Sequence, residues 1–512
     1  GVDVPGFVSL VGEKRYAEAL KLHRERNPFA AVCARVCFHS CEIKCRRSTV
    51  DEPVSIRGVK RYMVDQEITV QVPEMRENEA NARRKVAIVG AGPAGLFAAR
   101  ELAQQGVQVV LFNRDLKPGG LAEYGIYPDK HKMKEGLRNQ FRQILAHENV
   151  EYFGNVMVAQ NGDLQLDDLR QLGFQAILVT SGAQGTKWLG LPGERLRGVF
   201  HAKDLVYHYN LLPPYSQREY PIGRRVAVIG VGNVMLDIAR YLITMLHVDH
   251  VTAIARRGPG EVKFDKKELE SVAAYLDMED LQAEVQRVLP EMQAIGQEPT
   301  SFWDLINFCR FKAAQPLPPH LRLRFLLSPT RILGSSLNDV SGLEVEENTL
   351  SLVSGEVKSR GSGVRRVLDV DTVVFAIGDQ VDDHLGLPVR GSEFVKSPQP
   401  RFPVEGISYE AYEPDTDNPI PDVFMAGWAR QASTGLVGVA RKDGTNGARA
   451  LLQYLHTLQP LPHLPLAALH ERLAGLGKPV VTVAHLDRLL AIEQARAADL
   501  ALEEFKFNTN GD

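Results

Sequence analysis

The sequence predicts an α/β fold in which parallel β-sheets carry helices on both faces. Short apolar strands alternate with helical runs from residue 85 onward, which is the pattern of a parallel sheet. A glycine-rich turn joins a strand to a helix twice, at residues 90–95 and 230–233. Four cysteines gather before the first of these strands, in a stretch with helical spacing. We therefore expect two dinucleotide-binding units of the Rossmann type behind a helical, cysteine-bearing segment.

Composition narrows the classes of function. The 512 residues correspond to two to four domains at ~150 residues each. Basic and acidic residues number 60 and 63, which disfavours a protein whose main partner is nucleic acid or an anionic membrane. No apolar run approaches the ~20 residues that cross a bilayer, and the first residues are not a signal peptide, so we expect a cytoplasmic protein. The chain begins at Gly1 without methionine, which leaves open whether residues precede it.

Cysteines dominate the amino-terminal part. Apolar spacing predicts helices from Phe7 to Leu22, and the cysteines follow at intervals of four: Cys33, Cys37, Cys41 and Cys45. Clustered cysteines without a secretory signal favour metal or redox chemistry over structural disulfides. On one straight helix they would extend over about 18 Å, too far for a single cluster. Either the segment is not one helix, or the cysteines divide between two clusters. Cys309 is expected in the core, and residues 74–85 as a linker or solvated helix.

The first glycine-rich turn follows the strand at residues 86–89 and precedes a helix that runs to Gln105. Gly90 would make the tight turn, Gly92 would let a pyrophosphate approach the backbone, and Gly95 would let helix and strand pack closely. The next strand ends at Asn113, where an acidic residue usually binds the ribose. An amide can still hydrogen-bond a hydroxyl there, without ionic assistance.

The second turn carries Gly230 and Gly232 but has Met235 in place of the third glycine. The strand after it leads into Arg256 and Arg257. NAD sites usually place a carboxylate there, whereas a 2′-phosphate calls for arginine, so the pair favours NADP. The alternative is that both arginines are solvated surface charge.

Further strands are expected at residues 176–182, 372–378 and 423–428, each ending in small residues. A helix is expected at residues 444–458. The tail from Gln459 onward is rich in leucine, alanine and charge, and we expect it to be helical packing without chemistry.

From about residue 85 onward the chain resembles the adrenodoxin reductase family of NADPH:ferredoxin oxidoreductases, within the glutathione reductase-like superfamily. Its matching stretches are residues 120–126, 153–156, 191–194, 230–237, 256–259, 267–269, 426–428 and 434–437. The first eighty residues instead resemble the iron–sulfur segment of the glutamate synthase small subunit and of dihydropyrimidine dehydrogenase. The resemblance implies an NADP-binding domain inserted into an FAD-binding domain. The boundaries we expect are 1–80 for the iron–sulfur segment, 81–187 and 381–460 for the FAD domain, 188–380 for the NADP domain and 461–512 for the tail.

The resemblance also implies site residues. For FAD these are Gly90, Gly92, Ala94, Gly95, Asn113, Leu121, Val156, Gly427, Trp428, Gly435, Leu436 and Val437. For NADP they are Val231, Gly232, Asn233, Val234, Arg256, Arg257, Glu268 and Gly435. Trp428 and Gly435 are expected at the catalytic centre. The alternative for Trp428 is that it only packs, and either way its indole N–H requires a partner.

For the cysteines, the resemblance implies two [4Fe–4S] clusters that also use a cysteine run upstream of Gly1. The family's polar, non-cysteine ligand corresponds to Lys60, and because an ammonium cannot bind iron, Cys33 is the candidate replacement. Zinc is an alternative, although structural zinc sites favour cysteine pairs with two residues between them. Free thiols or a switch disulfide are the third alternative.

The resulting hypothesis is a flavoenzyme that moves electrons, in either direction, between NADPH and a ferredoxin-like protein or iron–sulfur partner. Hydride would pass from the nicotinamide C4 to the flavin N5. The alternative is the electron-input subunit of a larger hetero-oligomeric complex, similar to the glutamate synthase small subunit. A redox-silent nucleotide sensor is disfavoured because it would need neither Trp428 nor the cysteines.

Overall fold

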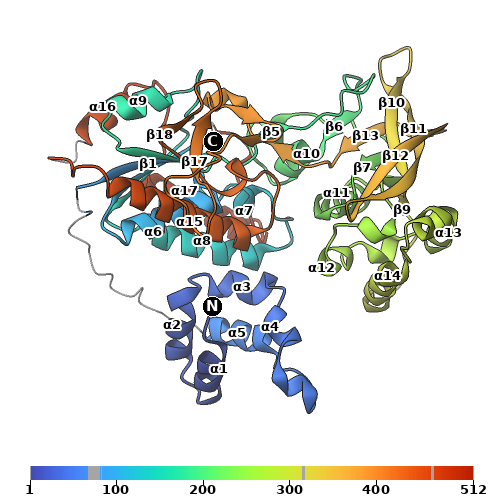
Figure 1. The fold of residues 1–512 in the computed structure, drawn as a ribbon, viewed down its shortest axis with the longest axis horizontal. Helices are drawn as coiled ribbons and strands as arrows, with labels where there is room; N and C mark the ends of the chain where they lie inside the picture. The colour runs from blue at the N-terminus through green and yellow to red at the C-terminus, as the bar shows by residue number, and fades with distance from the viewer. Residues whose placement is uncertain (1, 67–80, 82, 314–316, 463–465, 511–512) are drawn as a thin grey trace. The chain divides into compact units, whose positions relative to one another are not determined.

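The computed structural model describes the chain except for residues 1, 67–80, 82, 314–316, 463–465 and 511–512 (Figure 1). Residues 74–80 and 82 of the expected linker therefore lie outside the described residues. The chain forms two compact units. The first comprises Gly1–Gly185 and Gln380–Phe507, and the second comprises Thr186–Asp379 and Asn508–Asp512.

The first unit begins with short helices around a small core that includes Phe7, Leu20 and Met63. They are α1 (Val4–Gly12), α2 (Tyr16–Arg26), α3 (Ala30–Val36), α4 (Ser40–Ile43), the 3₁₀ turn η1 (Arg46–Thr49) and α5 (Ile56–Asp65). The predicted helical character of this segment is confirmed.

The main sheet of the first unit has the strand order β17-β18-β4-β1-β2-β3. Its strands are β1 (Lys85–Val89), β2 (Gln108–Asn113), β3 (Val150–Gly154), β4 (Ala176–Val179), β17 (Glu410–Glu413) and β18 (Asn418–Met425). All pairings are parallel except that of β17 with β18. Because strand side chains alternate between faces, Val86 and Ile88 enter one core and Ala87 and Val89 another.

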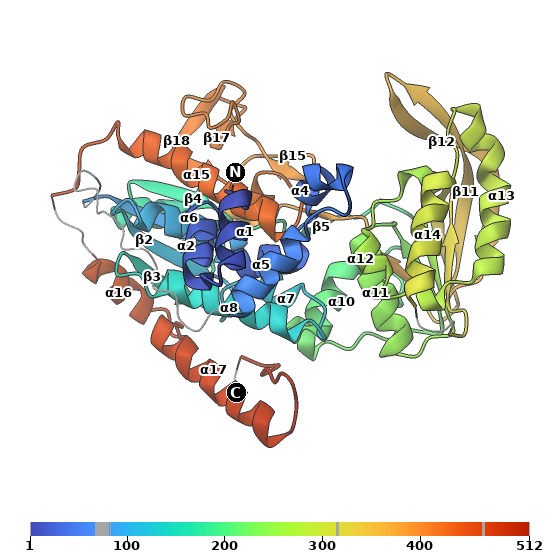
Figure 2. The same cartoon turned by 90° about the horizontal axis from the view of Figure 1, so that it is seen from below.

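Helices cover both faces of this sheet. The core beneath Val86 and Ile88 includes residues of α6 (Pro93–Ala103), α8 (His131–Leu145) and α15 (Val437–Leu455). Helices α6 and α15 lie side by side (Figures 1 and 2). The opposite core includes residues of α9 (Leu166–Gln171) and α16 (Ala467–Ala474). The remaining short elements of this unit are α7 (Leu121–Tyr124), β15 (Val389–Arg390), β16 (Glu393–Phe394) and the 3₁₀ turns η6 (Asp383–Leu385) and η7 (Gly427–Ala429).

The second unit contains a parallel sheet with the order β6-β13-β7-β8-β9. Its strands are β6 (Val199–His201), β7 (Arg225–Ile229), β8 (His250–Ile254), β9 (Leu321–Arg324) and β13 (Thr372–Phe375). The helices are α10 (Ala202–Tyr209), α11 (Asn233–Thr244), α12 (Lys266–Leu269), α13 (Met278–Ala294) and α14 (Thr300–Lys312), drawn from green to yellow in Figure 1. Cys309 is fully buried on α14, in the core where it was expected. The predicted α/β fold is thus confirmed in both units.

An antiparallel sheet of β10 (Leu327–Gly334), β11 (Val340–Val353) and β12 (Glu356–Leu368) was not predicted. The two-residue strands β5 (Gly185–Thr186) and β14 (Asp379–Gln380) lie where the chain passes from one unit to the other. In the tail, α17 (Val483–Asp499) follows α16. Every helix in the described part of the chain is too short or too polar to span a bilayer.

Candidate functional sites

The three glycines of the first glycine-rich turn have different structural roles. Gly90 has a φ of +107°, and a Cβ there would lie 2.6 Å from the Thr180 carbonyl oxygen. A Cβ on Gly95 would collide with the Gly90 carbonyl, so α6 packs closely on β1 only with glycine at this position. A Cβ on Gly92 would meet nothing within 4 Å. Gly92 caps α6, so the open space lies at the positive end of that helix, which suits a phosphate.

Asn113 holds this turn in place from the end of β2. Its Oδ1 accepts from the Ala91 amide at 3.1 Å, and its Nδ2 donates to the carbonyls of Asp115 and Lys117, each at 2.9 Å. Its own carbonyl accepts from the Val156 amide at 2.9 Å. The side chain is buried. Both amide hydrogens are therefore committed to the protein, and Oδ1 retains one lone pair for a further donor.

Leu121 lies next to this turn. A Cβ on Gly120 would be 3.2 Å from Gly92 Cα, so the loop before α7 closely approaches the first glycine-rich turn. Glu123 of α7 is buried and pairs with Arg138 at 2.6 Å and with Lys506 at 2.9 Å. Burial alone would raise the pKa of Glu123, but Lys506 and Arg138 together hold it well below its usual value. The charged contacts fix α7 against α8 and the tail.

Trp428 and its neighbours form a second part of the same site. The Trp428 indole Nε1 donates to the Thr434 carbonyl at 2.9 Å, so the expected need for a partner is met. Gly427 has a φ of +69°, and a Cβ there would lie 2.6 Å from Ala94 Cβ. The start of α6 and the loop after β18 therefore meet at the carboxyl ends of their parallel strands. Leu436 leaves 48% of its surface exposed before α15 begins at Val437.

Asp443 is a functional candidate that the sequence did not reveal. From α15 it accepts from the Gly427 amide at 2.6 Å and pairs with Arg430 at 2.5 Å. Tyr409 OH approaches its Oδ1 at 3.3 Å. In the sequence Asp443 follows Arg441 and Lys442, which is typical of a solvated helix face, so no local signal identified it.

The second glycine-rich turn repeats the first in outline. A Cβ on Gly230 would collide with the Ala376 carbonyl, whereas one on Gly232 would meet nothing within 4 Å. Met235, at the third position, is fully buried in the core of the second unit. Asn233 and Asp265 exchange two hydrogen bonds of 2.7 Å, which tie the start of α11 to the loop before α12.

Arg256 and Arg257 follow β8, beside this turn. Arg256 is exposed. Nη1 of Arg257 lies 3.6 Å from Oε2 of Glu261. The Nε of Arg257 is buried without a hydrogen-bond partner among the described residues. The pair thus offers cationic donors at the edge where a ribose would lie. Val231 is half-buried, Val234 is 45% exposed, and Glu268 lies half-buried on α12. Gly435, expected to contact both cofactors, belongs to the first unit.

The cysteine segment is broken rather than straight. Cys33 lies in α3, Cys37 ends it, Cys41 lies in α4 and Cys45 follows α4. His39 has a φ of +43°, which interrupts the helix, so the segment is not one straight helix. All four are half-buried free thiols. Backbone hydrogen bonds, that of Val54 first, lower the pKa of Cys45, which favours the thiolate that binds metal. Lys60 on α5 is buried.

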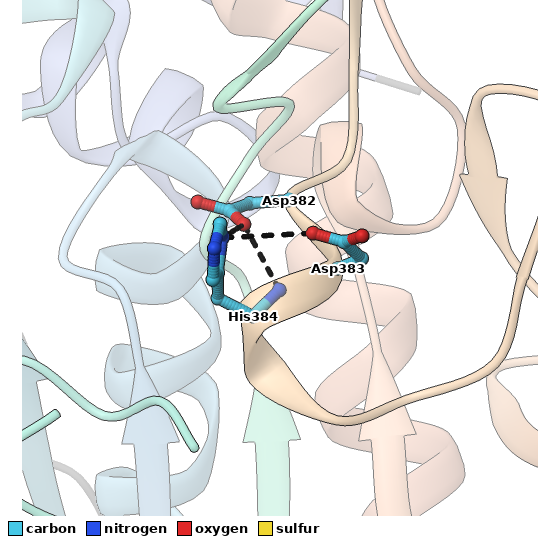
Figure 3. A group of neighbouring side chains, drawn as sticks. All are labelled: Asp382, Asp383 and His384. Carbon is cyan, nitrogen blue, oxygen red and sulfur yellow. Dashed lines mark hydrogen bonds and ion pairs between the residues drawn. The ribbon is translucent and has the colours of Figure 1, made fainter. Parts of the chain in front are cut away.

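In the part of the chain that the structure describes, three potential ligand atoms gather within 4.8 Å only at Asp382, Asp383 and His384 (Figure 3). Asp383 and His384 are exposed and Asp382 is half-buried, and Asp382 caps the turn by accepting from the His384 amide at 3.0 Å. The hydrogen bond that the His384 ring donates to the Asp382 carboxylate raises the pKa of that ring. The three side chains lie close together because they follow one another on a solvated turn. The four cysteines do not meet this spacing in the described structure.

The chain matches two protein families. Residues 1–72 match dihydropyrimidine dehydrogenase domain II, 4Fe-4S cluster, and residues 84–295 match pyridine nucleotide-disulphide oxidoreductase. The NADPH-ferredoxin reductase FprA of Mycobacterium leprae is 30% identical over 403 residues, which cover 72% of this chain and 84% of that protein. The mitochondrial NADPH:adrenodoxin oxidoreductase of Salvelinus fontinalis is 29% identical over 410 residues, covering 72% and 77%.

A further relative is the NADPH-Fe(3+) oxidoreductase subunit beta of Geobacter sulfurreducens, 27% identical over 76% of this chain and 52% of that protein. Among solved structures, Mycobacterium tuberculosis FprA in complex with NADPH is similar, with a TM-score of 0.69 and 26% identity. That match covers 83% of this chain and 97% of the other.

Proposed function

The chain belongs to the family of NADPH-ferredoxin reductases, and on this premise we propose that it is an FAD-dependent enzyme that passes electrons between NADPH and iron–sulfur centres. One observation carries the proposal: each of two βαβ units has a glycine, Gly92 or Gly232, with open space at the start of a helix. Two such turns suit two dinucleotides in one chain. No acid–base pair is required, because hydride transfer depends on positioning.

FAD would lie in the first unit. Gly92 and the start of α6 would bind its pyrophosphate, and the Gly427–Trp428 loop would border its ring. The open space at Gly92 fits the charged pyrophosphate of such a ligand, and the exposed Leu436 fits its apolar ring. Bound there, FAD would accept a hydride from NADPH and release the electrons singly. Asn113 keeps the phosphate turn rigid, and Asp443 holds the Gly427 amide.

NADPH would lie in the second unit. Gly232 and the start of α11 would bind its pyrophosphate, while Arg256 and Arg257 would bind the 2′-phosphate. The buried Nε of Arg257 supports this assignment, because a phosphate oxygen would supply the partner that it lacks among the described residues. Asn233 keeps the loop before α12 against the turn.

The cysteine segment would hold iron–sulfur clusters. Its four thiols are free and lie on either side of helix breaks, and the lowered pKa of Cys45 fits an iron ligand. Clustered cysteines that bind metal are also typical of a reducing compartment, which supports our proposal that the protein is cytoplasmic.

A second candidate is an electron-input subunit of a larger complex. The similarity to a beta subunit from Geobacter sulfurreducens supports it. The cysteine segment also exposes three large apolar side chains, Phe38, Ile43 and Val50, by 66%, 78% and 85%. Surface of this kind is typical of a protein contact. Stable copurification with an iron–sulfur partner would favour the subunit, whereas a monomer that reduces ferredoxin would favour a free-standing reductase.

The main proposal is tested by absorption spectroscopy with iron and flavin analysis, before and after anaerobic addition of NADPH. We expect flavin bands that bleach with NADPH, together with bound iron. A folded, colourless chain that contains neither flavin nor iron would refute the proposal.

A further inference from the structure

Helix α15 brings a cation to the cysteine segment. Nη1 of Arg441 lies 3.6 Å from Cys33 Sγ and also donates to the side-chain oxygen of Asn27. Arg441 follows Val437 by one helical turn, so it stands close to the stretch proposed to contact FAD. This side chain therefore joins the two redox parts of the first unit.

Aromatic packing holds this junction together. Phe29, just before α3, has its ring centroid 3.5 Å from that of Phe97 on α6 and 6.5 Å from that of Phe141 on α8. Phe29 and Val32 are buried in the same core as the main sheet of the first unit. The Arg441 guanidinium lies 6.0 Å from the Phe29 ring and 5.8 Å from the Phe97 ring. These rings restrict where the guanidinium can point.

The surroundings of the junction are cationic. The positive charges of Lys60, Arg441 and Arg24 contribute to the low pKa of His23, after burial. Burial is the main cause that lowers the pKa of Arg100; the charges of Arg24 and Arg441 lower it further, and Glu101 opposes them. An iron–sulfur cluster bound by thiolates is an anion, so a cationic junction at Cys33 suits it.

We propose that Arg441 is a positioning residue that fixes Cys33 against the FAD-binding part and raises the reduction potential of the iron–sulfur cluster that Cys33 helps to hold. This inference rests on the proposed function. A hydrogen bond and a positive charge at a ligating sulfur stabilise the reduced cluster, which carries one more negative charge. Cys33 is the one of the four cysteines that Arg441 contacts, and Arg441 lies one helical turn after Val437 of the stretch proposed to contact FAD.

The test uses the full chain, purified anaerobically with its FAD and iron. The variants are Arg441→Gln, Arg441→Lys and the control Arg449→Gln. Arg449 lies on the same helix and pairs instead with Glu101 at 2.9 Å, with 54% of its side chain exposed. A redox titration followed by electron paramagnetic resonance gives the cluster potential, and absorbance gives the flavin potential.

Arg441→Gln should lower the equilibrium constant for cluster reduction about tenfold, or about 59 mV for one electron. Arg441→Lys should lower it less, because the charge remains and only the planar fork is lost. The flavin potential in every variant and the cluster potential of Arg449→Gln should stay unchanged. A wild-type cluster potential in Arg441→Gln would overturn the inference. If Arg441→Gln does not retain iron, Arg441→Lys decides by the same criterion.

Two further measurements separate the possible failures. Cys33→Ser should lose iron, and a full iron content in that variant would overturn the role given to Cys33. Hydrogen exchange in α3 should rise in Arg441→Gln and stay unchanged in Arg449→Gln.

A wild-type chain without iron or flavin refutes the proposed function itself. A wild-type chain with both, whose cluster potential does not respond to Arg441, refutes only this inference.

Discussion

Asp443 accepts a hydrogen bond from the backbone amide of Gly427 at 2.6 Å, and this bond ties α15 to the loop that carries Trp428. The same carboxylate neutralises Arg430, and about nine-tenths of each side chain is buried. The Trp428 loop thus depends on a charge that lies fifteen residues further along the chain.

Replacing Asp443 by asparagine should therefore destabilise the first unit and weaken FAD binding. Asparagine keeps the size of the side chain but leaves Arg430 buried without a counter-ion, which costs about 3 kcal/mol of unfolding free energy. Urea unfolding and the FAD retained after gel filtration measure the two effects. The control is Asp422→Asn, whose partner Arg170 is 37% exposed, and it should cost less than about 1 kcal/mol. Equal effects of the two substitutions would contradict the role given to Asp443.

Gly92→Ala and Gly95→Ala should fail in different ways. A Cβ on Gly95 collides with backbone, so Gly95→Ala should prevent stable folding. A Cβ on Gly92 meets nothing, so Gly92→Ala should fold yet bind FAD about tenfold more weakly, because the methyl group occupies the pyrophosphate space. Thermal unfolding and fluorescence titration with FAD separate the two results. Gly136→Ala, also without a neighbour within 4 Å, is the matched control and should bind FAD normally. Unchanged FAD affinity in Gly92→Ala would exclude this turn as the phosphate site.

Much of this fold could be predicted from the sequence because its signals are local. The strand, turn and helix around Gly90 are contiguous, and so are those around Gly230. The antiparallel sheet β10–β12 was not predicted because β12 is largely exposed, so little apolar alternation marks it, and the buried positions of β11 are interrupted between Glu346 and Asn348, where its pairing with β12 shifts register. The distinct roles of Gly92 and Gly95 were also foreseeable, because turn mechanics depends on neighbouring residues.

The parts that escaped prediction depend on contacts between distant residues. Lys506 and Glu504 of the tail reach Glu123 and Arg138, and Glu493 of α17 pairs with the buried Lys117. In the sequence these residues are ordinary charges in a helical tail, and only the fold brings them to α7. The same holds for Arg441 and Cys33, which lie 408 positions apart.

Removing both Arg256 and Arg257 should weaken NADPH selectively. A charged donor to phosphate contributes about 1.5–3 kcal/mol, so KM for NADPH should rise at least about tenfold in the double alanine variant, with KM for NADH unchanged. Steady-state reduction of a one-electron acceptor by each coenzyme measures this. Arg197→Ala is the control, because Arg197 is 70% exposed and pairs with Asp339 at 2.8 Å. Equal losses with both coenzymes would rule out a 2′-phosphate site here.

Acidification should loosen the helices around His23 before pH ~4 is reached. His23 is buried edge-on to Phe7, and burial, assisted by the charge of Lys60, lowers its pKa to about 4. In the unfolded chain this ring takes up a proton near pH ~6.5, so between the two values the unfolded state binds more protons. Stability should thus be constant above pH ~6.5 and fall by up to about 3 kcal/mol as the pH decreases to ~4. Hydrogen exchange of α1 and α2 across this range measures the effect locally. His23→Gln should flatten the pH dependence, while His384→Gln, at an exposed turn, should retain it. A steep dependence that persists in His23→Gln would assign it to another group.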